Sequence, residues 1–415
     1  VKNIVKSQQD YSRYVFDRSF RKGVIDTRDE MKHPVKLEEE EYKDEEGEYV
    51  DHDYRVKFSI DNAGVNAGYD PFWGVYGLTQ IYLSDVLGDH QLQIGANIIQ
   101  SFADSDLLLG YQNLKNRLNW GASAYQFVNF FATTFGTARF INRGVGLQTS
   151  YPFSRFRRMN FAMQFITIAD ENISYFMIPR RSFSLLMPSL SYTTDNSLWG
   201  YTGPARGRRN YIGITGSPKF GDDGKEFVTA SFDFRQYFTI VKDYSLALRL
   251  TGGASFGKNP TLFLIGGVDN WLNYRFDDKI DAFSVQDYFL SDLLTPLRGA
   301  NYYEMIGTRA LLMNMEFRFP FIQYLITRFP LPIGLQRIEG IGFLDAGSAW
   351  ADDKSWRFSA KKADGDRYVR DITTGFGYGL RINLYMFLLK IDIAYRTDFD
   401  YVSKPRIYYS IGIDF

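Results

Sequence analysis

Hydrophobic and polar residues alternate with a period of two along most of the chain. The segments 227–235 (FVTASFDFR), 311–319 and 389–396 (LKIDIAYR) each carry large apolar side chains at every second position and mainly small, polar or charged ones between them. Successive side chains of a β-strand point to opposite faces, so this pattern predicts strands with one apolar and one polar face. The expected fold class is all-β.

Two all-β architectures fit such strands, a soluble sandwich and a transmembrane barrel. The apolar faces here are rich in Phe, Tyr, Met and Leu, while the opposite faces hold charges, glycines and hydroxyl side chains, as a wet lumen would. Aromatic residues make up 17% of the chain, with 36 Phe and 29 Tyr. Such rings concentrate where a membrane meets water. The composition therefore favours the barrel.

The alternating segments number sixteen, an even count as closed bacterial barrels require. We predict a 16-stranded antiparallel transmembrane β-barrel with strands near 54–64, 72–84, 90–102, 106–114, 117–131, 138–151, 156–169, 182–194, 207–217, 226–239, 244–256, 305–319, 337–350, 373–386, 388–398 and 406–415.

Connections between these strands alternate in length. Short turns are expected on the periplasmic side and long loops outside. The longest loop, 257–304, joins strands 11 and 12 and is expected to fold inward. The connection 320–336 breaks the rule, because it is long and Pro-rich on the side of the short turns.

The N-terminal part differs in kind from the rest. Residues 38–53 contain ten acidic residues and one lysine. Charge runs of this type form solvated linkers, so residues 1–52 are expected to be an acidic periplasmic segment before a barrel at 53–415. The chain opens at Val1 without a methionine or an apolar signal core, which suggests a processed or trimmed chain. No run of 18 apolar residues exists for a transmembrane helix.

Overall composition excludes several kinds of chemistry. Lys plus Arg and Asp plus Glu are 48 each, which gives no basic field for nucleic acid. Cysteine is absent and the three histidines are scattered, so neither a metal centre nor a cofactor is expected. Ser84, Asp85 and His90 are neighbours in one tight turn and cannot adopt a catalytic triad. The protein is not expected to be an enzyme.

One arginine in the long loop has candidate partners on the strands that follow. By the period-two pattern, Glu316 faces the lumen, and Asp345 lies on the next strand. Charges inside a partly dehydrated barrel are costly unless they are paired. Arg298, folding inward, could satisfy both carboxylates with its planar fork.

Several motifs carry a resemblance to a known family. LRGA (297–300), MNMEFRFP (313–320), FLDAGSAW (343–350), YTTDNSLWGYTGPARG (192–207) and FLIGG (263–267) occur in the order and strand positions typical of the BamA/TamA superfamily of outer-membrane insertases and translocators, also called the bacterial surface antigen family. The resemblance covers about residues 53–415. It implies that the loop motif Leu297, Arg298 and Gly299 enters the barrel.

The same resemblance implies partners for this motif, namely Glu316, Asp345 and Gly347, the last residue of F-x-D-x-G. Ala300 stands where the family has an aromatic residue, and Tyr302 or Tyr303 could substitute for it. The loop is also longer than usual, and POTRA repeats are lacking. The likeness is nearest to Bacteroidota-type versions in which a β-propeller precedes the barrel.

Function is expected at a seam between the first and last strands, where glycine weakens pairing. The seam residues are expected to be Tyr54, Val56, Phe58, Gly64, Ile407, Tyr409, Ile411 and Phe415. Opening of this seam could template an incoming strand and so insert or export proteins. The final segment also resembles the C-terminal signal of outer-membrane barrels.

Alternatives remain open at this stage. They are a passive solute channel and a barrel that anchors a periplasmic or surface protein. Candidate partners are outer-membrane lipids and lipopolysaccharide, client proteins, a periplasmic domain and lipoproteins. The expected location is the bacterial outer membrane, with the N-terminus in the periplasm.

Overall fold

The computed structural model describes residues 54–415 apart from 71–73, 100, 134–135, 173–180, 222–223, 275–289, 328–332, 352–355, 358, 362–366, 385–386, 398–400 and 414. The chain divides into two compact units, Val1–Val56 and Lys57–Phe415. The acidic run at 38–53, and with it the expected boundary between residues 52 and 53, lies outside the described residues. The fold below is that of Lys57–Phe415.

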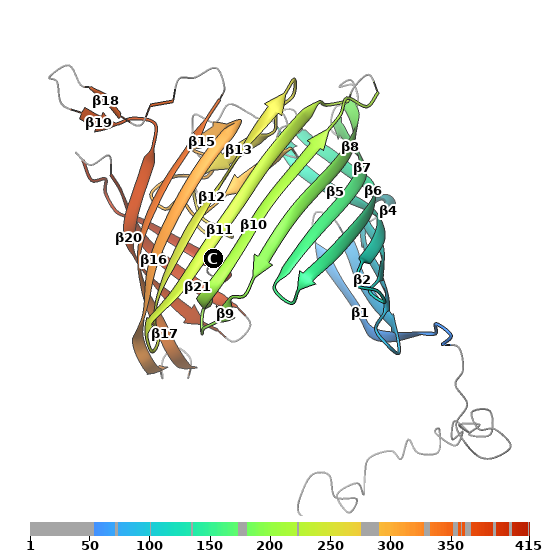
Figure 1. Ribbon diagram of the computed structural model, residues 1–415, viewed down its shortest axis with the longest axis horizontal. Coiled ribbons are helices and arrows are strands. Elements are labelled where there is room, and N and C mark those ends of the chain that lie inside the picture. The colour runs from blue at the N-terminus through green and yellow to red at the C-terminus, as the bar shows by residue number, and fades with distance from the viewer. Residues whose placement is uncertain are drawn as a thin grey trace, which may run out of the picture. The chain divides into compact units, whose positions relative to one another are not determined.

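One large sheet of 17 strands dominates the described residues (Figure 1). Its two-residue strand β9 (Leu198–Trp199) lies beside β10, and the other sixteen pair antiparallel in chain order. The prediction of sixteen antiparallel strands is therefore confirmed. They are β1 (Phe58–Asp70), β2 (Gly74–Asp85), β3 (His90–Ile99), β4 (Ser101–Asn113), β5 (Asn119–Thr133), β6 (Gly136–Ser154), β7 (Arg157–Asn172), β8 (Arg181–Asp195), β10 (Pro204–Ser217), β11 (Phe227–Val241), β12 (Tyr244–Gly257), β16 (Arg309–Thr327), β17 (Ile333–Trp350), β20 (Thr373–Asn383), β21 (Leu388–Thr397) and β22 (Arg406–Ile411).

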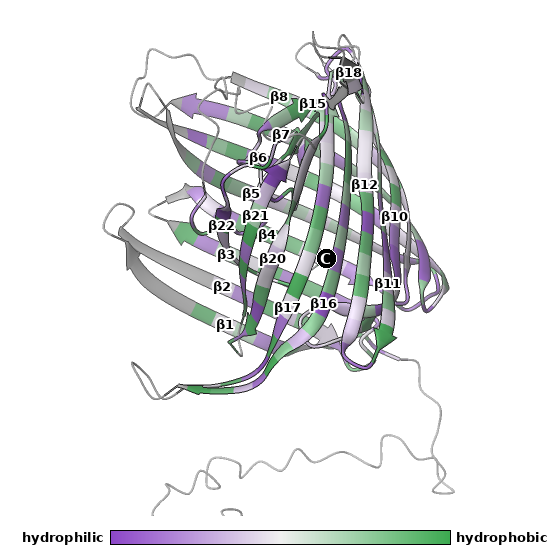
Figure 2. Cartoon of the chain, turned by 90° about the vertical axis from the view of Figure 1, so that its left-hand side faces the viewer, coloured by the Kyte–Doolittle hydropathy of each residue, from purple (hydrophilic) through white to green (hydrophobic). Residues whose placement is uncertain are grey.

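Strand β16 shows how the alternation sorts side chains between the two faces. Leu311 and Met313 are 42% and 47% exposed, whereas Leu312 and Asn314 are 0% exposed. Figure 2 shows the same alternation of hydrophobic and hydrophilic positions along other strands. Large apolar side chains left exposed strand after strand need a non-aqueous surrounding, which a lipid bilayer supplies.

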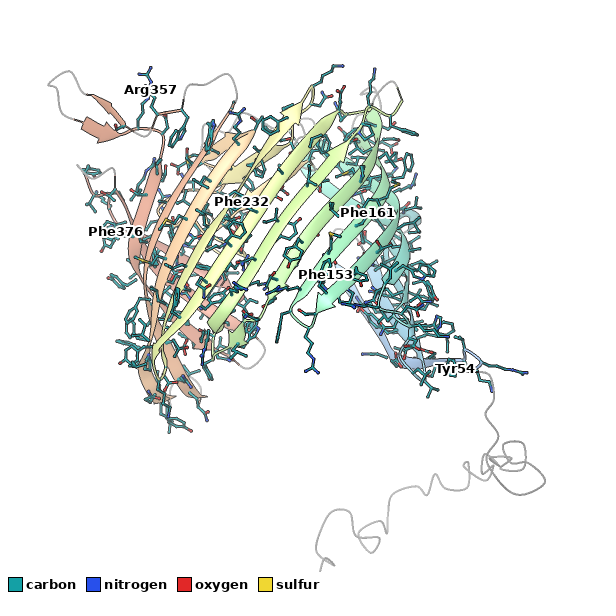
Figure 3. The ribbon with its side chains drawn as sticks, viewed as in Figure 1. Tyr54, Phe153, Phe161, Phe232, Arg357 and Phe376 are labelled. Carbon is teal, nitrogen blue, oxygen red and sulfur yellow. The ribbon has the colours of Figure 1, made fainter. Side chains whose placement is uncertain are left out.

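The outer face carries many aromatic side chains. Phe161 on β7 and Phe376 on β20 are 43% and 37% exposed, and Figure 3 shows them among the side chains that cover the strands. Within the described residues, no helix is long and apolar enough to cross a membrane.

The interpretation of 320–336 as a long connection is wrong. β16 and β17 continue to pair with each other beyond Arg318 and Glu339, where their ladders to β12 and β20 end. The hairpin therefore extends past the neighbouring strands. Pro320 is tolerated because β16 has lost its β12 neighbour at that position, so the missing N–H breaks no ladder bond.

The ends of the sheet also differ from the prediction. The last strand was expected to run to Phe415, but β22 ends at Ile411. Gly412 has φ +132°, a conformation that only glycine adopts readily, and the chain leaves the sheet there. The first strand begins at Phe58 instead of residue 54 and continues to Asp70.

The long loop and residues 305–307, which were predicted as the start of the strand 305–319, form a small separate sheet that the periodicity did not reveal. β13 (Leu262–Ile265) pairs with β14 (Ser291–Leu294) and β15 (Met305–Gly307). Its apolar side chains pack on Ala310 and Leu312, which face inward from β16. These two apolar residues on the lumenal face thus form the surface against which the loop packs. A further pair, β18 (Ser359–Lys361) and β19 (Arg367–Val369), lies between β17 and β20 in the chain.

Candidate functional site inside the barrel

Glycines bring the tip of the long loop against the wall. Gly267 and Leu297 exchange main-chain hydrogen bonds of 3.2 and 2.9 Å, which close the loop on itself. Gly299 has φ +97°, and Gly375 on β20 lies directly beneath the tip. A Cβ atom on Gly375 would lie 1.8 Å from the main-chain oxygen of Arg298. The approach therefore requires glycine at this position.

Arg298 is the centre of a buried ion-pair cluster. Its Nε and Nη2 donate to the two carboxylate oxygens of Asp345 at 2.6 and 2.8 Å, and its main-chain N–H donates to the same group at 3.1 Å. Nη1 donates to Glu316 at 2.9 Å. The arginine is 1% exposed. Two-pronged pairing of this kind fixes orientation as well as charge.

Neighbouring strands complete the cluster. Arg318 donates to the second oxygen of Glu316, at 2.9 Å from Nη2. Arg381 on β20 pairs with Asp392 on β21 at 2.7 Å, and Asp392 lies 3.9 Å from Arg298. The cluster has no net charge, because its three arginines balance its three carboxylates: Arg298, Arg318 and Arg381 against Glu316, Asp345 and Asp392. A buried cluster without net charge avoids the cost of an unpaired charge.

Two further contacts shape the site around the guanidinium. Asn314 donates to Asp345 at 2.8 Å and to the main-chain oxygen of Pro296 at 2.7 Å. The Arg298 guanidinium carbon lies 3.6 Å from the ring centre of Phe343, in a cation–π contact. Asn314 therefore links Asp345 on β17 to the loop, and the Phe343 ring packs against the face of the Arg298 guanidinium.

Burial and charge act in opposite directions on Arg298. Burial alone lowers the pKa of the guanidinium, but the negative charges of Asp345 and Glu316 outweigh it and raise the pKa above its ordinary value. The loop arginine therefore stays charged.

The last strand also contacts the loop tip. The hydroxyl of Tyr408 on β22 accepts the N–H of Gly299 at 2.7 Å and donates to the main-chain oxygen of Ala300 at 2.9 Å. Arg406 on the same strand donates to the side chain of Asn301 at 2.9 Å. The loop is thus joined to β22 as well as to β16 and β17.

Comparison with known proteins identifies the family of this chain. Residues 112–415 match the Omp85 superfamily domain. The chain belongs to the Omp85 superfamily. A crystal structure of BamA from Haemophilus ducreyi lacking POTRA domains 1–3 has the same fold, with a TM-score of 0.53 at 13% identity. The match covers 86% of this chain and 70% of that chain.

Two CdiB structures also resemble this Omp85 barrel. CdiB from Acinetobacter baumannii has a TM-score of 0.44 at 14% identity, over 86% of this chain and 60% of that one. CdiB from Escherichia coli has a TM-score of 0.46 at 12% identity, over 88% of this chain and 64% of that one. This chain therefore spans less than two thirds of either CdiB chain. No curated protein matches it in sequence.

The sequence-predicted motif residues of the Omp85 barrel lie together. Leu297 is fully buried and packs with the loop core. Gly347 on β17 faces it, and a Cβ atom there would lie 3.0 Å from Leu312 and 3.4 Å from Leu297. Glycine at this position therefore leaves room for the loop. Ala300 is fully buried, and Tyr302 packs against the cluster that contains Trp271.

Sequence reasoning missed several members of the site, namely Asn314, Phe343, Arg381, Asp392 and Tyr408. Asp392 and Arg381 had a signal, because each is charged at a position whose parity points to the lumen. Tyr408 had none, since a tyrosine fits either face of a membrane strand.

The predicted seam residues lie in different parts of the structure. Phe58 and Gly64 lie on β1, and Ile407, Tyr409 and Ile411 lie on β22, but the described strands show no ladder between β1 and β22. Tyr54 and Val56 precede β1 and belong to the first unit.

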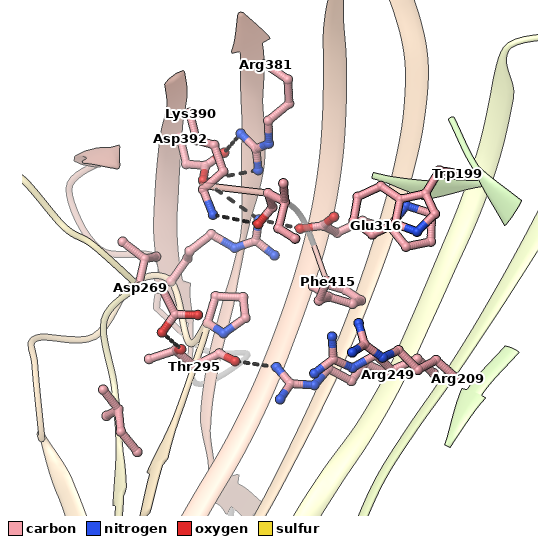
Figure 4. Close-up of a pocket in the computed structure, with 17 residues that line it drawn as sticks. Trp199, Arg209, Arg249, Asp269, Thr295, Glu316, Arg381, Lys390, Asp392 and Phe415 are labelled. Atoms are coloured by element: carbon pink, nitrogen blue, oxygen red, sulfur yellow. Dashed lines mark hydrogen bonds and ion pairs between the residues drawn. The ribbon is translucent and has the colours of Figure 1, made fainter. Parts of the chain in front are cut away.

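Phe415 was expected on the apolar outer face, and this expectation is wrong. Its ring lines a lumenal cavity of about 240 Å³ (Figure 4). The main-chain oxygen of Phe415 accepts a hydrogen bond of 3.0 Å from Arg318. Because the chain turns at Gly412, residue 415 no longer follows the parity of β22.

The cavity beside the Arg298 ion-pair cluster is lined mainly by polar and charged groups. Arg249 pairs with Asp233 at 2.8 Å and also donates to the main-chain oxygen of Thr295 in the loop. Arg235 pairs with the same Asp233 at 2.7 Å. In the described part of the chain, no cluster of His, Asp or Glu has the arrangement of a metal site.

Proposed function

We propose that this Omp85 barrel inserts proteins into the outer membrane, or exports them across it, at a seam between β1 and β22. The long loop is held inside the barrel by the cluster of Arg298, Glu316 and Asp345, called the loop lock below. The observation that carries the proposal is this buried lock together with its link to β22 through Tyr408.

The lock supports the proposal because it connects three parts of the wall to one loop. Arg298 binds β16 through Glu316 and β17 through Asp345, while the neighbouring Gly299 binds β22. A change at the seam strand is therefore transmitted to the loop, and the reverse also holds. A passive pore has no need of such a connection.

The edge of β1 that faces away from β2 supports a seam at this place, because the described strands show no ladder along it. Strand edges bind further strands through their unpaired main-chain groups. On β1, a Cβ atom added at Gly64 would have no protein atom within 4 Å. Glycine is a weak strand former, which lowers the cost of separating β1 from a partner.

The turn at residues 84–90 gives no support for an enzyme. Asp85 accepts the main-chain N–H of His90 at 2.9 Å, and the His90 ring contacts the hydroxyl of Tyr111 at 2.7 Å. Ser84 donates to Asp61 at 3.0 Å. The Ser84 hydroxyl and the His90 ring thus bond to residues outside the turn, and Asp85 bonds to the main chain of His90, as in a structural turn.

The orientation and partners belong to the same proposal. The N-terminal segment lies on the periplasmic side, where the short turns of such barrels face. Unfolded barrel proteins are the clients, lipids and lipopolysaccharide surround the wall, and a periplasmic domain or lipoprotein delivers the clients.

The test is replacement of the lock arginine in cells that depend on this protein. Arg298→Ala is expected to lower the amounts of client proteins in the outer membrane several-fold while the barrel itself remains present. The matched control is Arg139→Ala, because Arg139 also makes two ion pairs of 2.6 Å, with Asp104 and Glu171, away from the lock. Normal client levels with Arg298→Ala would refute the proposal.

A further inference from the structure

The outer edge of the last strand is occupied by the long loop. Residues 407, 409 and 411 of β22 direct their main-chain groups away from β21, because successive residues of a strand bond to opposite sides. The N–H of Leu272 donates to the oxygen of Tyr409 at 2.8 Å, and the N–H of Ile411 donates to the oxygen of Asn270 at 3.4 Å. Trp271 and Ser410 form an antiparallel bridge.

Two asparagine side chains extend this pairing. Asn270 donates from its amide to the oxygen of Ile411 at 3.0 Å. Asn273 donates to the oxygen of Ile407 at 3.0 Å and accepts the N–H of Tyr409 at 2.9 Å. Residues 270–273, called the edge latch below, therefore satisfy five main-chain groups along the three outward-facing residues of β22.

The edge latch is itself anchored inside the barrel. The Trp271 ring lies 4.6 Å from the Tyr408 ring and 5.2 Å from the Tyr302 ring. The main-chain N–H of Trp271 donates to the Tyr302 hydroxyl at 3.3 Å, and that hydroxyl donates to the main-chain oxygen of Val268 at 2.6 Å. Trp271 is 4% exposed. The loop therefore holds β22 by its inner face through Tyr408 and by its edge through the latch.

We propose that the outward edge of β22 is a strand-binding surface whose resident occupant is the edge latch, and that β1 of the same chain is the strand that replaces it. The two occupants exclude each other, because both need the main-chain groups of Ile407, Tyr409 and Ile411. The latch has four residues, whereas β1 has 13 and pairs with β2 through its other edge. While the seam is open, the latch satisfies the outward main-chain groups of β22, which would be costly to leave unpaired in lipid.

The physical basis is an exchange of hydrogen-bond partners at the same main-chain groups of β22. Replacing the latch by β1 breaks the bonds of residues 270–273 and forms ladder bonds in their place. Displacement of the latch by β1 one residue at a time would keep most of these β22 groups bonded throughout, because main-chain hydrogen bonds hold a strand that adds to a sheet edge. Its consequence for client proteins rests on the proposed function, but the exchange itself does not.

A photocrosslinker at position 409 tests the exchange in the full-length protein in membranes. With p-benzoylphenylalanine in place of Tyr409, crosslinked peptides are expected to contain residues 270–273. In the double variant Asn270→Ala, Asn273→Ala, crosslinks to β1 are expected to rise at least five-fold relative to crosslinks to the loop. Asn259→Ala is the matched control, since Asn259 belongs to the same loop but accepts the N–H of Glu226.

Two results would overturn the proposal. One is that crosslinks in the double variant stay on the loop peptide, and the other is that β1 is already the main target with Asn270 and Asn273 intact. Heat-modifiable migration of the barrel in gels shows that each variant is folded.

A disulfide supplies a second, independent test. The chain has no cysteine, and Leu272 and Tyr409 are adjacent and exposed, at 57% and 41%. The pair Leu272→Cys, Tyr409→Cys is expected to oxidise readily and to block exchange until it is reduced. The control pair Ile391→Cys, Tyr409→Cys joins two positions already paired between β21 and β22. Failure of the first pair to oxidise while the control pair does so would overturn the latch.

The same disulfide separates the latch from the proposed function. If oxidation of the Leu272→Cys, Tyr409→Cys pair stops client assembly and reductant restores it, while the control pair has no effect, the exchange and the proposed function are both supported. If the crosslinks exchange as expected but the oxidised latch leaves client assembly unchanged, the exchange stands and the role in client insertion fails.

Discussion

The hydroxyl of Tyr408 lies between the N–H of Gly299 and the oxygen of Ala300, at 2.7 and 2.9 Å. These contacts join the last strand of the barrel to the tip of a loop more than 100 residues earlier in the chain. The same loop tip carries Arg298, whose ion pairs reach β16 and β17. One short segment thus connects the edge of the sheet to two strands of its wall.

Removing this hydroxyl is expected to loosen the loop without unfolding the barrel. Tyr408→Phe leaves the Gly299 N–H and the Ala300 oxygen without a partner, which costs about 1–3 kcal/mol. Deuterium uptake of the peptide containing residues 297–300 measures the effect. Tyr192→Phe, on the outer wall at 39% exposure, is expected to change nothing. Equal uptake in both variants would show that the Tyr408 contacts do not restrain the tip.

The lock should behave as a coupled charge cluster. Arg298→Met leaves two buried carboxylates without their common partner, and the expected loss in the free energy of unfolding is on the order of 3–5 kcal/mol. Adding Asp345→Asn removes one uncompensated charge and should recover part of this loss. Urea unfolding in detergent micelles measures both variants. If the losses of Arg298→Met alone and Asp345→Asn alone add up to the loss of the double variant, Arg298 and Asp345 are not coupled.

Two glycine substitutions test whether the close contact between Gly375 and the loop tip, and not the strand propensity of the residue, determines the position of the loop. In Gly375→Ala the new methyl group would collide with the main-chain oxygen of Arg298, 1.8 Å from the ideal Cβ position. Overpacking of this kind costs on the order of 1–3 kcal/mol. We expect Gly375→Ala to displace the loop tip and to make the loop more sensitive to added protease.

Gly342→Ala is the matched control for this substitution. Gly342 also lies on a wall strand, β17, but its ideal Cβ position has no protein atom within 4 Å. Alanine there should leave the free energy of unfolding within about 0.5 kcal/mol of the original value. If both variants lowered stability equally, the loss would come from the strand and not from the loop.

Periodicity was sufficient to predict the wall of the barrel. Along β16, lipid-facing positions such as Met313 are 47% exposed and inward-facing neighbours such as Asn314 are 0% exposed, and this contrast follows the alternation of the sequence. It failed at Pro320, because a long Pro-rich segment has the composition of a loop whether or not its main chain pairs.

The site was less accessible from the sequence than the wall. Arg298, Glu316 and Asp345 were predicted because charged groups in a lumen need partners. Tyr408 and Asn270 act through hydrogen bonds between segments distant in the chain, and no local pattern encodes such contacts. Phe415 was misplaced because a single turn at Gly412 cancels the parity of the strand before it.

The most direct measurement of the central claim is the rate at which the purified protein inserts a client. Unfolded outer-membrane barrel protein is added to proteoliposomes, and folded, protease-resistant client is followed over time. The original protein and Arg139→Ala should accelerate insertion equally over empty liposomes, while Arg298→Ala should be at least ten-fold slower. Equal acceleration by Arg298→Ala, with the variant correctly folded, would contradict the account.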